Sequence, residues 1–363
     1  MATRVRSYSK INLGLAIGPV RADGFHGLAT LYQTLALHDW VTVSARRMAP
    51  GSRTRITLTS NHAQVPADAR NTAWKMVQRA LTRMGVAAEV TVDIQKELPV
   101  EGGMGAGSAN AAAALLGLER ELGIALPEEE RIELAAEVGS DVPLFLVGGA
   151  ILGTGRGEQV LGVCDLPPTP CVVAVPGVGV STPRAFRDWD EKQGPHTNGL
   201  TPAPQPDRLN VLSLAYASVL GLPTEAAQDT SGIVRGPLVD SSPEKKQVGL
   251  ESKIFNQGNT LNGLAGNPLL ALVRTGIEND FEQVVFPQYP LLREIKHELM
   301  GPSDSEEAAV YAALSGSGSA LFGLYRSNAD ARAAQQRVQA SGCKAILTET
   351  LPRQEYWRTM FAE

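Results

Sequence analysis

The segment Pro99-Val-Glu-Gly-Gly-Met-Gly-Ala-Gly-Ser108 decides the fold of this 363-residue chain. Four glycines in six residues let successive backbone N–H groups turn inward with no Cβ in the way. These are Gly102, Gly103, Gly105 and Gly107. The alanine-rich run that follows predicts a helix with Ser108 as its N-cap. Because a helix N-terminus attracts negative charge, the loop and the helix together predict a phosphate-binding turn.

Two better-known glycine loops do not fit this turn. Ser108 follows Gly107 with no lysine between them, so the pattern G-x-x-x-x-G-K-[ST] is missing, and the glycine spacing does not match G-x-G-x-x-G. The remaining alternative is an ordinary tight strand-to-helix connection, which needs one or two glycines rather than four. We therefore expect a phosphate site that is neither a P-loop nor a Rossmann fingerprint.

Outward from the turn, the pattern predicts a mixture of strands and helices. Period-two alternation predicts strands, and helical spacing after a capping signal predicts helices. The expected strands are residues 41–43, 55–59, 90–94, 171–175 and 320–325, and residues 150–152 form a short apolar run. The expected helices follow the cap Asn71-Thr72 and the turn at Ser108, and a third runs from Glu128 to Val138 and stops at Gly139. This last stop places Asp141, just before Val142-Pro143, on a turn.

The length favours two domains, or one large unit with two lobes. We expect an N-terminal domain over residues 1–162 and a C-terminal domain over 163–363. From about residue 188 to 257 the composition shifts to Pro, Gln, Asp, Ser and Gly, which predicts a flexible insertion within the second domain.

Composition indicates a globular, soluble protein, with 43% hydrophobic and 20% charged residues. The net charge of −5 comes without a basic stripe, so neither nucleic acid nor a membrane surface is an expected partner. No apolar run reaches the roughly 20 residues that a membrane span needs. The three cysteines show neither zinc-site pairing nor an even count, and no cleavable signal pattern appears at the start. We expect a cytoplasmic protein. Its oligomeric state cannot be read from the sequence.

Transfer of a phosphoryl group to an alcohol needs a group that orients or accepts the hydroxyl proton, and positive charge near the phosphoryl. Asp141 and Lys10 are the candidates, although alone an Asp of this kind is more often a helix cap and a Lys a surface group. Asp23-Gly24-Phe25-His26 offers a stacking face beside a hydrogen-bonding edge, but by itself it is a common turn. The Ser/Gly run 314–319 could close over phosphates, yet alone it indicates a flexible loop. No H-x-x-x-H pair occurs, so no metal ligand is assigned.

Taken in order, several segments resemble the GHMP kinases, the group of galactokinase, homoserine, mevalonate and phosphomevalonate kinases. The glycine turn and its helix mark that superfamily. Lys10-Ile-Asn-Leu13, Asp23-Gly-Phe-His26 and Asp141-Val-Pro143 resemble the branch that phosphorylates 4-diphosphocytidyl-2-C-methyl-D-erythritol in the non-mevalonate (MEP) isoprenoid pathway. All the segments that support the resemblance, besides the glycine turn, are Ser9-Lys-Ile-Asn-Leu13, Arg21-Ala-Asp-Gly-Phe-His26, Gly139-Ser-Asp-Val-Pro-Leu-Phe145, Gly153-Thr-Gly-Arg-Gly-Glu158, Asn279-Asp-Phe-Glu282 and Leu314-Ser-Gly-Ser-Gly318.

The resemblance implies a two-lobed α+β fold with the active site in the cleft between the lobes. It implies transfer of the γ-phosphoryl of ATP, with Mg²⁺ on the nucleotide, to the 2-hydroxyl of the cytidyl substrate. Asp141 would be the catalytic base, and Lys10 would contact the reacting hydroxyl and the γ-phosphate. The implied substrate-binding residues are Asn12, Phe25, His26, Thr182 and Phe186. The implied ATP-binding residues are Pro99, Gly102, Gly103, Gly105, Gly107 and Ser108.

The chain departs from the family pattern at two notable positions. Phe25 stands where the family usually has Tyr, which keeps the stacking face and loses a hydroxyl. Asn110 stands where the family commonly has Asp, and an amide supplies no negative charge for a magnesium ion.

Two other functions remain as alternatives. Another GHMP kinase, of the homoserine or mevalonate type, would share the phosphate loop but not the cytidine pocket. A non-catalytic nucleotide-binding protein would bind ATP without turnover, although the presence of Lys10 and Asp141 favours an enzyme.

Overall fold

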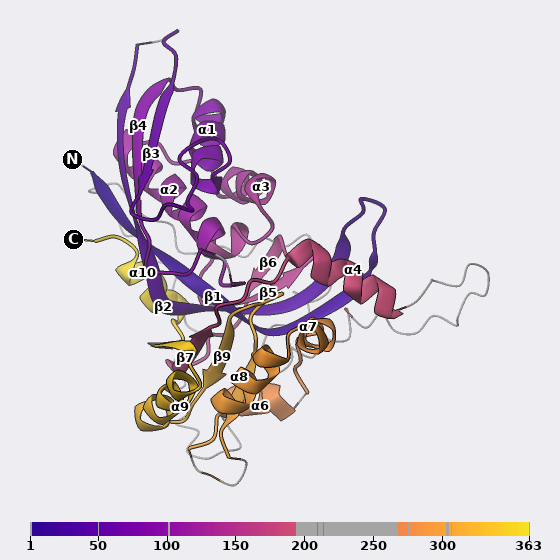
Figure 1. The fold of residues 1–363 in the computed structure, drawn as a ribbon. Helices are drawn as coiled ribbons and strands as arrows, with labels where there is room; N and C mark the ends of the chain where they lie inside the picture. Colours follow the sequence, from indigo (N-terminus) through magenta and orange to yellow (C-terminus); the bar gives the residue numbers. More distant parts are fainter. Residues whose placement is uncertain are drawn as a thin grey trace, which may run out of the picture.

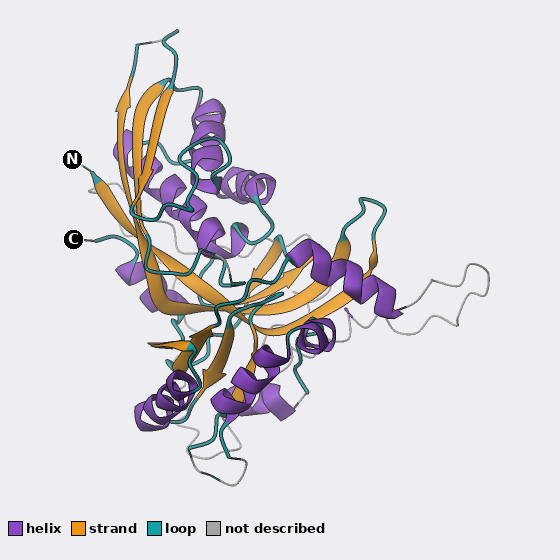
Figure 2. Cartoon of the chain, in the orientation of Figure 1, coloured by secondary structure: helices purple, strands orange, loops and turns teal. Residues whose placement is uncertain are grey.

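The computed structural model describes residues 2–49, 51–100, 102–193, 268–274, 276–302 and 307–362, with the single positions Leu209, Ser213 and Ser305. Most of the expected insertion at 188–257 therefore lies outside the described residues. Within them, the chain forms two β-sheets with helices packed on both (Figures 1 and 2). The predicted α+β architecture with two lobes is confirmed.

Two long antiparallel strands connect the lobes. β1 (Thr3–Val20) pairs with β2 (His26–Arg47) along almost its whole length. The register shifts after Tyr8, Asn12 and Ile17, and such irregularities bend a strand pair and increase its twist. Side chains of β1 consequently enter three separate hydrophobic clusters, represented by Val5, Ile11 and Leu15.

The N-terminal lobe is built on the first half of this pair. β4 (Ala88–Gln95) lies antiparallel to β2, and β3 (Arg55–Ser60) lies parallel to β4 at the edge. Three helices pack over one face of these strands: α1 (Thr72–Met84), α2 (Ala106–Leu122) and α3 (Glu128–Val138). The small residues of α2 permit close approach, since a Cβ on Gly117 would lie 2.7 Å from a methyl group of Val43.

The C-terminal lobe is built on a second sheet, against which the last part of the first sheet packs. The hairpin β5 (Ala150–Thr154) and β6 (Gln159–Gly162) extends the first sheet beside β2. The second sheet has the order β10 (Lys344–Glu349), β7 (Pro170–Val175), β9 (Leu321–Leu324), β8 (Tyr311–Leu314). One hydrophobic cluster contains residues of both sheets, and another packs the second sheet against helices. Within the described residues, the helices of this lobe are α4 (Thr182–Gln193), α6 (Pro268–Arg274), α7 (Glu282–Gln288), α8 (Pro290–Met300) and α9 (Asn328–Ala340).

After β10 the chain returns to the N-terminal lobe. α10 (Arg353–Thr359) packs Tyr356 into that lobe's core, and the Tyr356 hydroxyl donates to the Phe145 carbonyl at 2.6 Å. Phe361 then bridges to Val5, so the two termini lie side by side (Figure 1).

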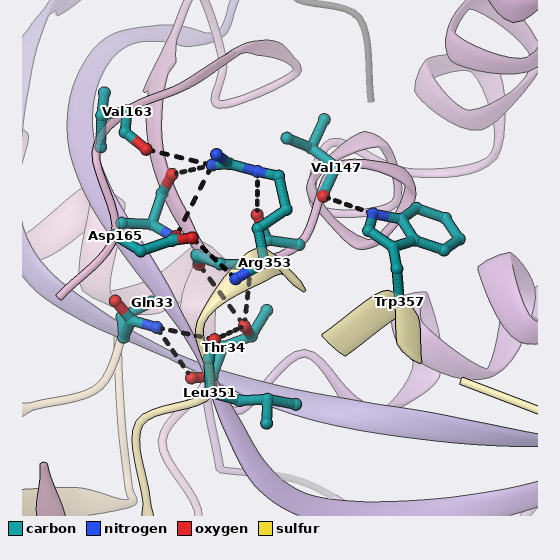
Figure 3. Close-up of polar contacts among 11 residues, drawn as sticks. Gln33, Thr34, Val147, Val163, Asp165, Leu351, Arg353 and Trp357 are labelled. Atoms are coloured by element: carbon teal, nitrogen blue, oxygen red, sulfur yellow. Dashed lines mark hydrogen bonds and ion pairs between the residues drawn. The ribbon is translucent and has the colours of Figure 1, made fainter. Parts of the chain in front are cut away.

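Polar contacts of the returning segment fix its path (Figure 3). The Arg353 guanidinium donates to the carbonyls of Gly148, Ala150 and Val163 at 3.1, 2.7 and 3.2 Å. The Leu351 carbonyl accepts from the side chains of Gln33 and Thr34 at 3.1 and 2.8 Å. The Trp357 indole donates to the Val147 carbonyl at 3.0 Å. Because the acceptors Val147, Gly148 and Ala150 follow Asp141 closely in the chain, the returning segment supports the stretch after the turn that carries Asp141.

Most predicted elements are confirmed, including the strands and the helix from Glu128 to Val138 that ends at Gly139. Asn71 caps α1 through a hydrogen bond from the Ala73 amide at 2.9 Å, as expected. The prediction that Ser108 is the N-cap of α2 is wrong. Gly105 takes that position, and Ser108 lies within the first turn. Among the described residues we find no helix with the length and apolar character of a membrane span.

A buried ion pair fixes the approach to the glycine turn. Asp39, on β2, is fully buried and forms an ion pair with Lys96 just after β4. Its second oxygen accepts from the amides of Glu97 and Leu98 at 2.8 Å each. The chain is therefore anchored directly before Pro99.

We predict that Asp39→Ala destabilises the protein by about 3–5 kcal/mol, because it leaves the Lys96 charge buried without a partner. Urea unfolding followed by circular dichroism measures this loss. The matched control is Asp93→Ala, an exposed carboxylate on β4, for which we expect less than about 1 kcal/mol. Equal losses in the two variants would contradict the anchoring role of Asp39.

Candidate active site

The glycine turn adopts a conformation that residues with a side chain rarely reach. Gly102, Gly103 and Gly105 have φ angles of 140°, 76° and 72°. α2 begins at Ala106 with no side-chain cap, and Gly107 and Ser108 lie in its first turn. The first N–H groups of a helix have no intrahelical partner, so this end of α2 offers donors and a positive dipole to an anion. Pro99 lies beside the turn, with its Cγ 3.9 Å from the position of a Cβ on Gly102.

A second glycine-rich loop, between β8 and β9, packs directly on the first. The Ser315 hydroxyl donates to the Gly103 carbonyl at 3.0 Å, and the Ala320 amide donates to the Gly102 carbonyl at 3.2 Å. A Cβ on Gly103 would lie only 2.0 Å from the Ser315 carbonyl oxygen. The Ser/Gly run that looked like a flexible loop in the sequence thus forms a defined contact with the glycine turn.

Lys10 and Asp141 meet next to these loops. Lys10 is buried on β1, and its backbone amide donates to the carbonyl of Met104 within the glycine turn at 3.1 Å. Its Nζ lies 3.4 Å from Asp141 Oδ2 and donates to Asn12 Oδ1 at 2.7 Å. A Cβ on Gly316 would lie 3.6 Å from the same Nζ, which brings the second loop to the pair. A carboxylate and an ammonium therefore lie together where the two glycine loops meet.

Asp141 sits on a turn, as predicted, between α3 and the short 3₁₀ helix Pro143–Leu146. The Val142 amide donates to the Gly139 carbonyl at 3.0 Å and closes the turn. The side chain of Asp141 remains 33% exposed, so one carboxylate face can meet a ligand.

Asn12 and Thr182 both lie beside the second glycine loop. Asn12 is buried and donates through Nδ2 to the Thr30 hydroxyl at 2.8 Å. The Thr182 hydroxyl, at the start of α4, lies 2.7 Å from the hydroxyl of Ser317 in the second glycine loop. Asn12 comes from β1 and Thr182 from α4.

The three aromatic candidates divide into two groups. His26 stacks on Phe186, with ring centroids 4.9 Å apart and an interplanar angle of 9°. The His26 ring nitrogens face the Gly18 carbonyl at 2.9 Å and Asp190 Oδ1 at 3.3 Å. Phe25 is 53% exposed and instead lies under the guanidinium of Arg156, 4.9 Å from its ring centroid. The structure therefore brings His26 and Phe186 together and leaves Phe25 on the rim.

The side-chain oxygen of Asn110 is used within the protein rather than offered to a metal ion. It is buried in α2, and its Oδ1 accepts from the Ser7 hydroxyl at 2.6 Å. No group of three or more His, Cys, Asp or Glu side chains in the described part of the chain is arranged to hold a metal ion.

Sequence reasoning missed two residues that contact this site. The Tyr32 hydroxyl donates to Asp141 Oδ1 at 3.2 Å, and burial together with the nearby carboxylate raises the pKa of Tyr32 well above its ordinary value. Asn279 donates to the carbonyls of Leu314 and Gly316 at 2.8 and 2.7 Å, which fixes the second glycine loop. The segment containing Asn279 resembles the family, but nothing local in the sequence marks Tyr32 or gives Asn279 its partner.

Comparison with known proteins identifies the class of protein to which this fold belongs. The family model of the GHMP kinases N terminal domain matches residues 71–149, and that of the GHMP kinases C terminal domain matches residues 267–344. Among solved structures, a 4-(cytidine 5'-diphospho)-2C-methyl-D-erythritol kinase aligns over 96% of this chain and 99% of its own, with a TM-score of 0.62 and 23% identity. A homoserine kinase from Cytophaga hutchinsonii has a TM-score of 0.63 at 16% identity, over 98% and 96% of the two chains. The fold is that of the GHMP kinases.

Sequence relatives narrow the class. A 4-diphosphocytidyl-2-C-methyl-D-erythritol kinase of Nocardia farcinica is 37% identical over 72% of this chain and 80% of its own. The one of Solibacter usitatus is 30% identical over 99% and 93%. The one of Rhodococcus jostii is 42% identical over 51% of this chain and 58% of its own. This chain belongs to the 4-diphosphocytidyl-2-C-methyl-D-erythritol kinase family.

We predict that Gly103→Ala separates the two glycine loops and weakens ATP binding at least about tenfold, because the new Cβ would overlap the Ser315 carbonyl. Isothermal titration calorimetry with ATP measures the change. Gly123→Ala is the matched control, since Gly123 also has a positive φ, of 60°, but its Cβ would meet nothing within 4 Å. A similar ATP affinity in both variants would show that the contact between the loops is dispensable.

Proposed function

We propose that this protein transfers the γ-phosphoryl group of ATP to the 2-hydroxyl of 4-diphosphocytidyl-2-C-methyl-D-erythritol, within the MEP pathway. The observation that carries the proposal is the Lys10–Asp141 pair, 3.4 Å apart, at the junction of the two glycine loops. Membership of the family supplies the reaction and the substrate. Another GHMP kinase activity has less support, because the homoserine kinase likeness extends to the fold alone.

In this proposal Asp141 accepts the proton of the attacking hydroxyl. Lys10 is a positive charge that contacts the same hydroxyl and the γ-phosphate. Phosphoryl transfer depends mainly on positioning and on stabilising charge, and both groups serve these needs. The burial of Lys10 supports its role, since a charge shielded from water acts more strongly on a nearby phosphate. The ATP phosphates lie along Gly102, Gly103, Gly105, Gly107 and Ser108, next to Pro99.

In this proposal the cytidine end of the substrate binds beside the three aromatic candidates. Phe25, His26 and Phe186 supply stacking faces, and His26 adds a hydrogen-bonding edge. Asn12 and Thr182 lie near the methylerythritol diphosphate. Because Phe186 stacks on His26 in this structure, the base would insert beside this pair with Phe25 on its outer face.

Magnesium enters on the nucleotide in this proposal. Mg²⁺ commonly keeps several waters and binds substrate phosphates with one or two carboxylates rather than a protein cage. No group of metal-binding side chains is found among the described residues, and Asn110 accepts a hydrogen bond from Ser7. Both observations fit a magnesium ion that is held by the phosphates. When bound, Mg²⁺ neutralises charge on the phosphates that the glycine loop holds.

Two further parts of the proposal concern organisation and location. We assign residues 1–162 to an ATP-binding domain and 163–363 to the second domain, with α10 of the second domain packed on the first. The three cysteines are all free, which supports a reducing compartment such as the cytoplasm.

The deciding experiment is an ADP-release assay with the purified full chain. We expect ATP to be converted only when 4-diphosphocytidyl-2-C-methyl-D-erythritol is added, EDTA to stop the reaction, and Asp141→Asn to lower kcat at least about 100-fold. Phosphorus NMR of the product locates the new phosphate. Turnover with homoserine or mevalonate instead would indicate another GHMP kinase. ATP binding without any turnover would indicate a non-catalytic protein.

We further predict that His26→Ala raises KM for the cytidyl substrate at least about tenfold and leaves KM for ATP within about twofold, because the ring contacts only the cytidine end. Steady-state kinetics with each substrate varied in turn separates the two effects. His62→Ala, an exposed histidine in the N-terminal lobe, is the control. An equal rise in both KM values would argue against the cytidine pocket.

A further inference from the structure

Tyr32 contacts the proposed base from a rigid strand. It lies within β2, is 2% exposed, and donates its hydroxyl hydrogen to Asp141 Oδ1 at 3.2 Å. The other carboxylate oxygen, Oδ2, faces Lys10 Nζ at 3.4 Å. Each oxygen of Asp141 therefore has its own partner, and the two partners come from the two neighbouring strands β1 and β2.

The glycine cluster Gly153-Thr-Gly-Arg-Gly157 makes room for this tyrosine. A Cβ on Gly153 would lie 2.5 Å from Tyr32 Cε2, and a Cβ on Gly157 would lie 2.5 Å from the Tyr32 hydroxyl. Both glycines belong to the β5–β6 hairpin, which pairs with β2 through Ile151 and Tyr32. No role could be assigned to this glycine cluster from the sequence. In the structure it is the surface against which the Tyr32 ring packs.

The charges around the hydroxyl keep it a donor. Asp141 and Glu158 both disfavour a phenolate at Tyr32, and burial does so more strongly. Lys10 Nζ lies 5.5 Å from the centroid of the ring, and Glu158 is itself paired with Arg156 at 3.7 Å. Tyr32 remains protonated throughout the range in which a kinase works, so it can donate to an ionised carboxylate.

Asp141 needs such a partner because the closed turn fixes its backbone but not the rotation of its side chain. It sits on a turn outside any regular element and is one-third exposed, so its side chain has room to rotate. A general base must point at the hydroxyl from hydrogen-bond distance, and small displacements cost much of the rate.

We propose that Tyr32, seated on Gly153 and Gly157, is a positioning residue that holds the Asp141 carboxylate toward the acceptor hydroxyl. This role rests on the proposed function of Asp141 as the base. Tyr32 itself does not react. Its hydrogen bond favours the ionised carboxylate and fixes its rotation, while Lys10 remains available to the phosphoryl group.

The test is Tyr32→Phe, which keeps the ring and removes only the hydroxyl. We expect kcat to fall about tenfold with KM for ATP and for the cytidyl substrate each within about twofold. We also expect the acid limb of the kcat–pH profile to move to higher pH, because the ionised carboxylate loses a hydrogen-bond donor. Tyr8→Phe is the matched control: its hydroxyl also has a protein partner, Thr359 at 2.5 Å, but none in the site. The control should keep both kcat and the profile.

A wild-type kcat and an unmoved pH profile in Tyr32→Phe would overturn the proposal. A raised KM for the cytidyl substrate at unchanged kcat would overturn it too, because Tyr32 would then be a substrate ligand. The wild-type assay comes first: if the wild type lacks the cytidyl-dependent reaction, the proposed function has failed, whereas an active wild type with an unaffected variant rejects only the role of Tyr32.

A second variant tests the glycine seat. Gly153→Ala should push the ring and lower kcat about as much as Tyr32→Phe does, and the double variant should be no slower than either single one, because both changes act through the same hydroxyl. Circular dichroism and thermal unfolding check that each variant is folded. Losses in kcat that multiply in the double variant would show that Gly153 acts independently of Tyr32.

Discussion

The pairing of β1 with β2 is the constraint on which the rest of the structure depends. Lys10 and Asn12 come from one strand, and His26 and Tyr32 from the other, so their relative positions are set by the register of a single ladder. A slip of one residue would turn every one of these side chains to the opposite face. The three bulges matter for the same reason, since they bend the pair so that it serves the cores of both lobes.

The two glycine loops form the second level of organisation. Their backbones approach so closely that a single methyl group on Gly103 would overlap a carbonyl of the opposite loop. Glycine here has a purpose beyond conformational freedom, because it lets a loop of each lobe share one surface. Asn279 holds one loop and the Asp39–Lys96 pair anchors the other, and these supports lie outside the residues that would touch a substrate.

How far the sequence predicted this site depended on how local each signal was. The glycine turn, the strand alternation and the stop at Gly139 are local patterns, and the structure confirms the elements that they predicted. Ser108 was wrong as a cap because the helix starts at Ala106, before the last glycine of the turn, with Gly105 in the cap position. Tyr32 could not be identified from the sequence, because its role depends on contacts with Asp141 and two glycines. These residues are more than a hundred positions away and meet Tyr32 only in the folded protein. The placement of α10 was equally invisible for the same reason.

That placement bears on how the protein is made. Tyr356 and Met360 are buried in the core that the first residues of the chain begin, and the backbone of Met360 pairs with Arg6. On the ribosome the N-terminal lobe therefore emerges without part of its interior, and these hydrophobic contacts form only once α10 has been synthesised. Domains usually fold as units from the N-terminus onward, but here the first lobe is completed only after the second lobe has been made. An incomplete polypeptide would expose that unfilled surface, which would make truncated products recognisable to the quality-control machinery of the cell.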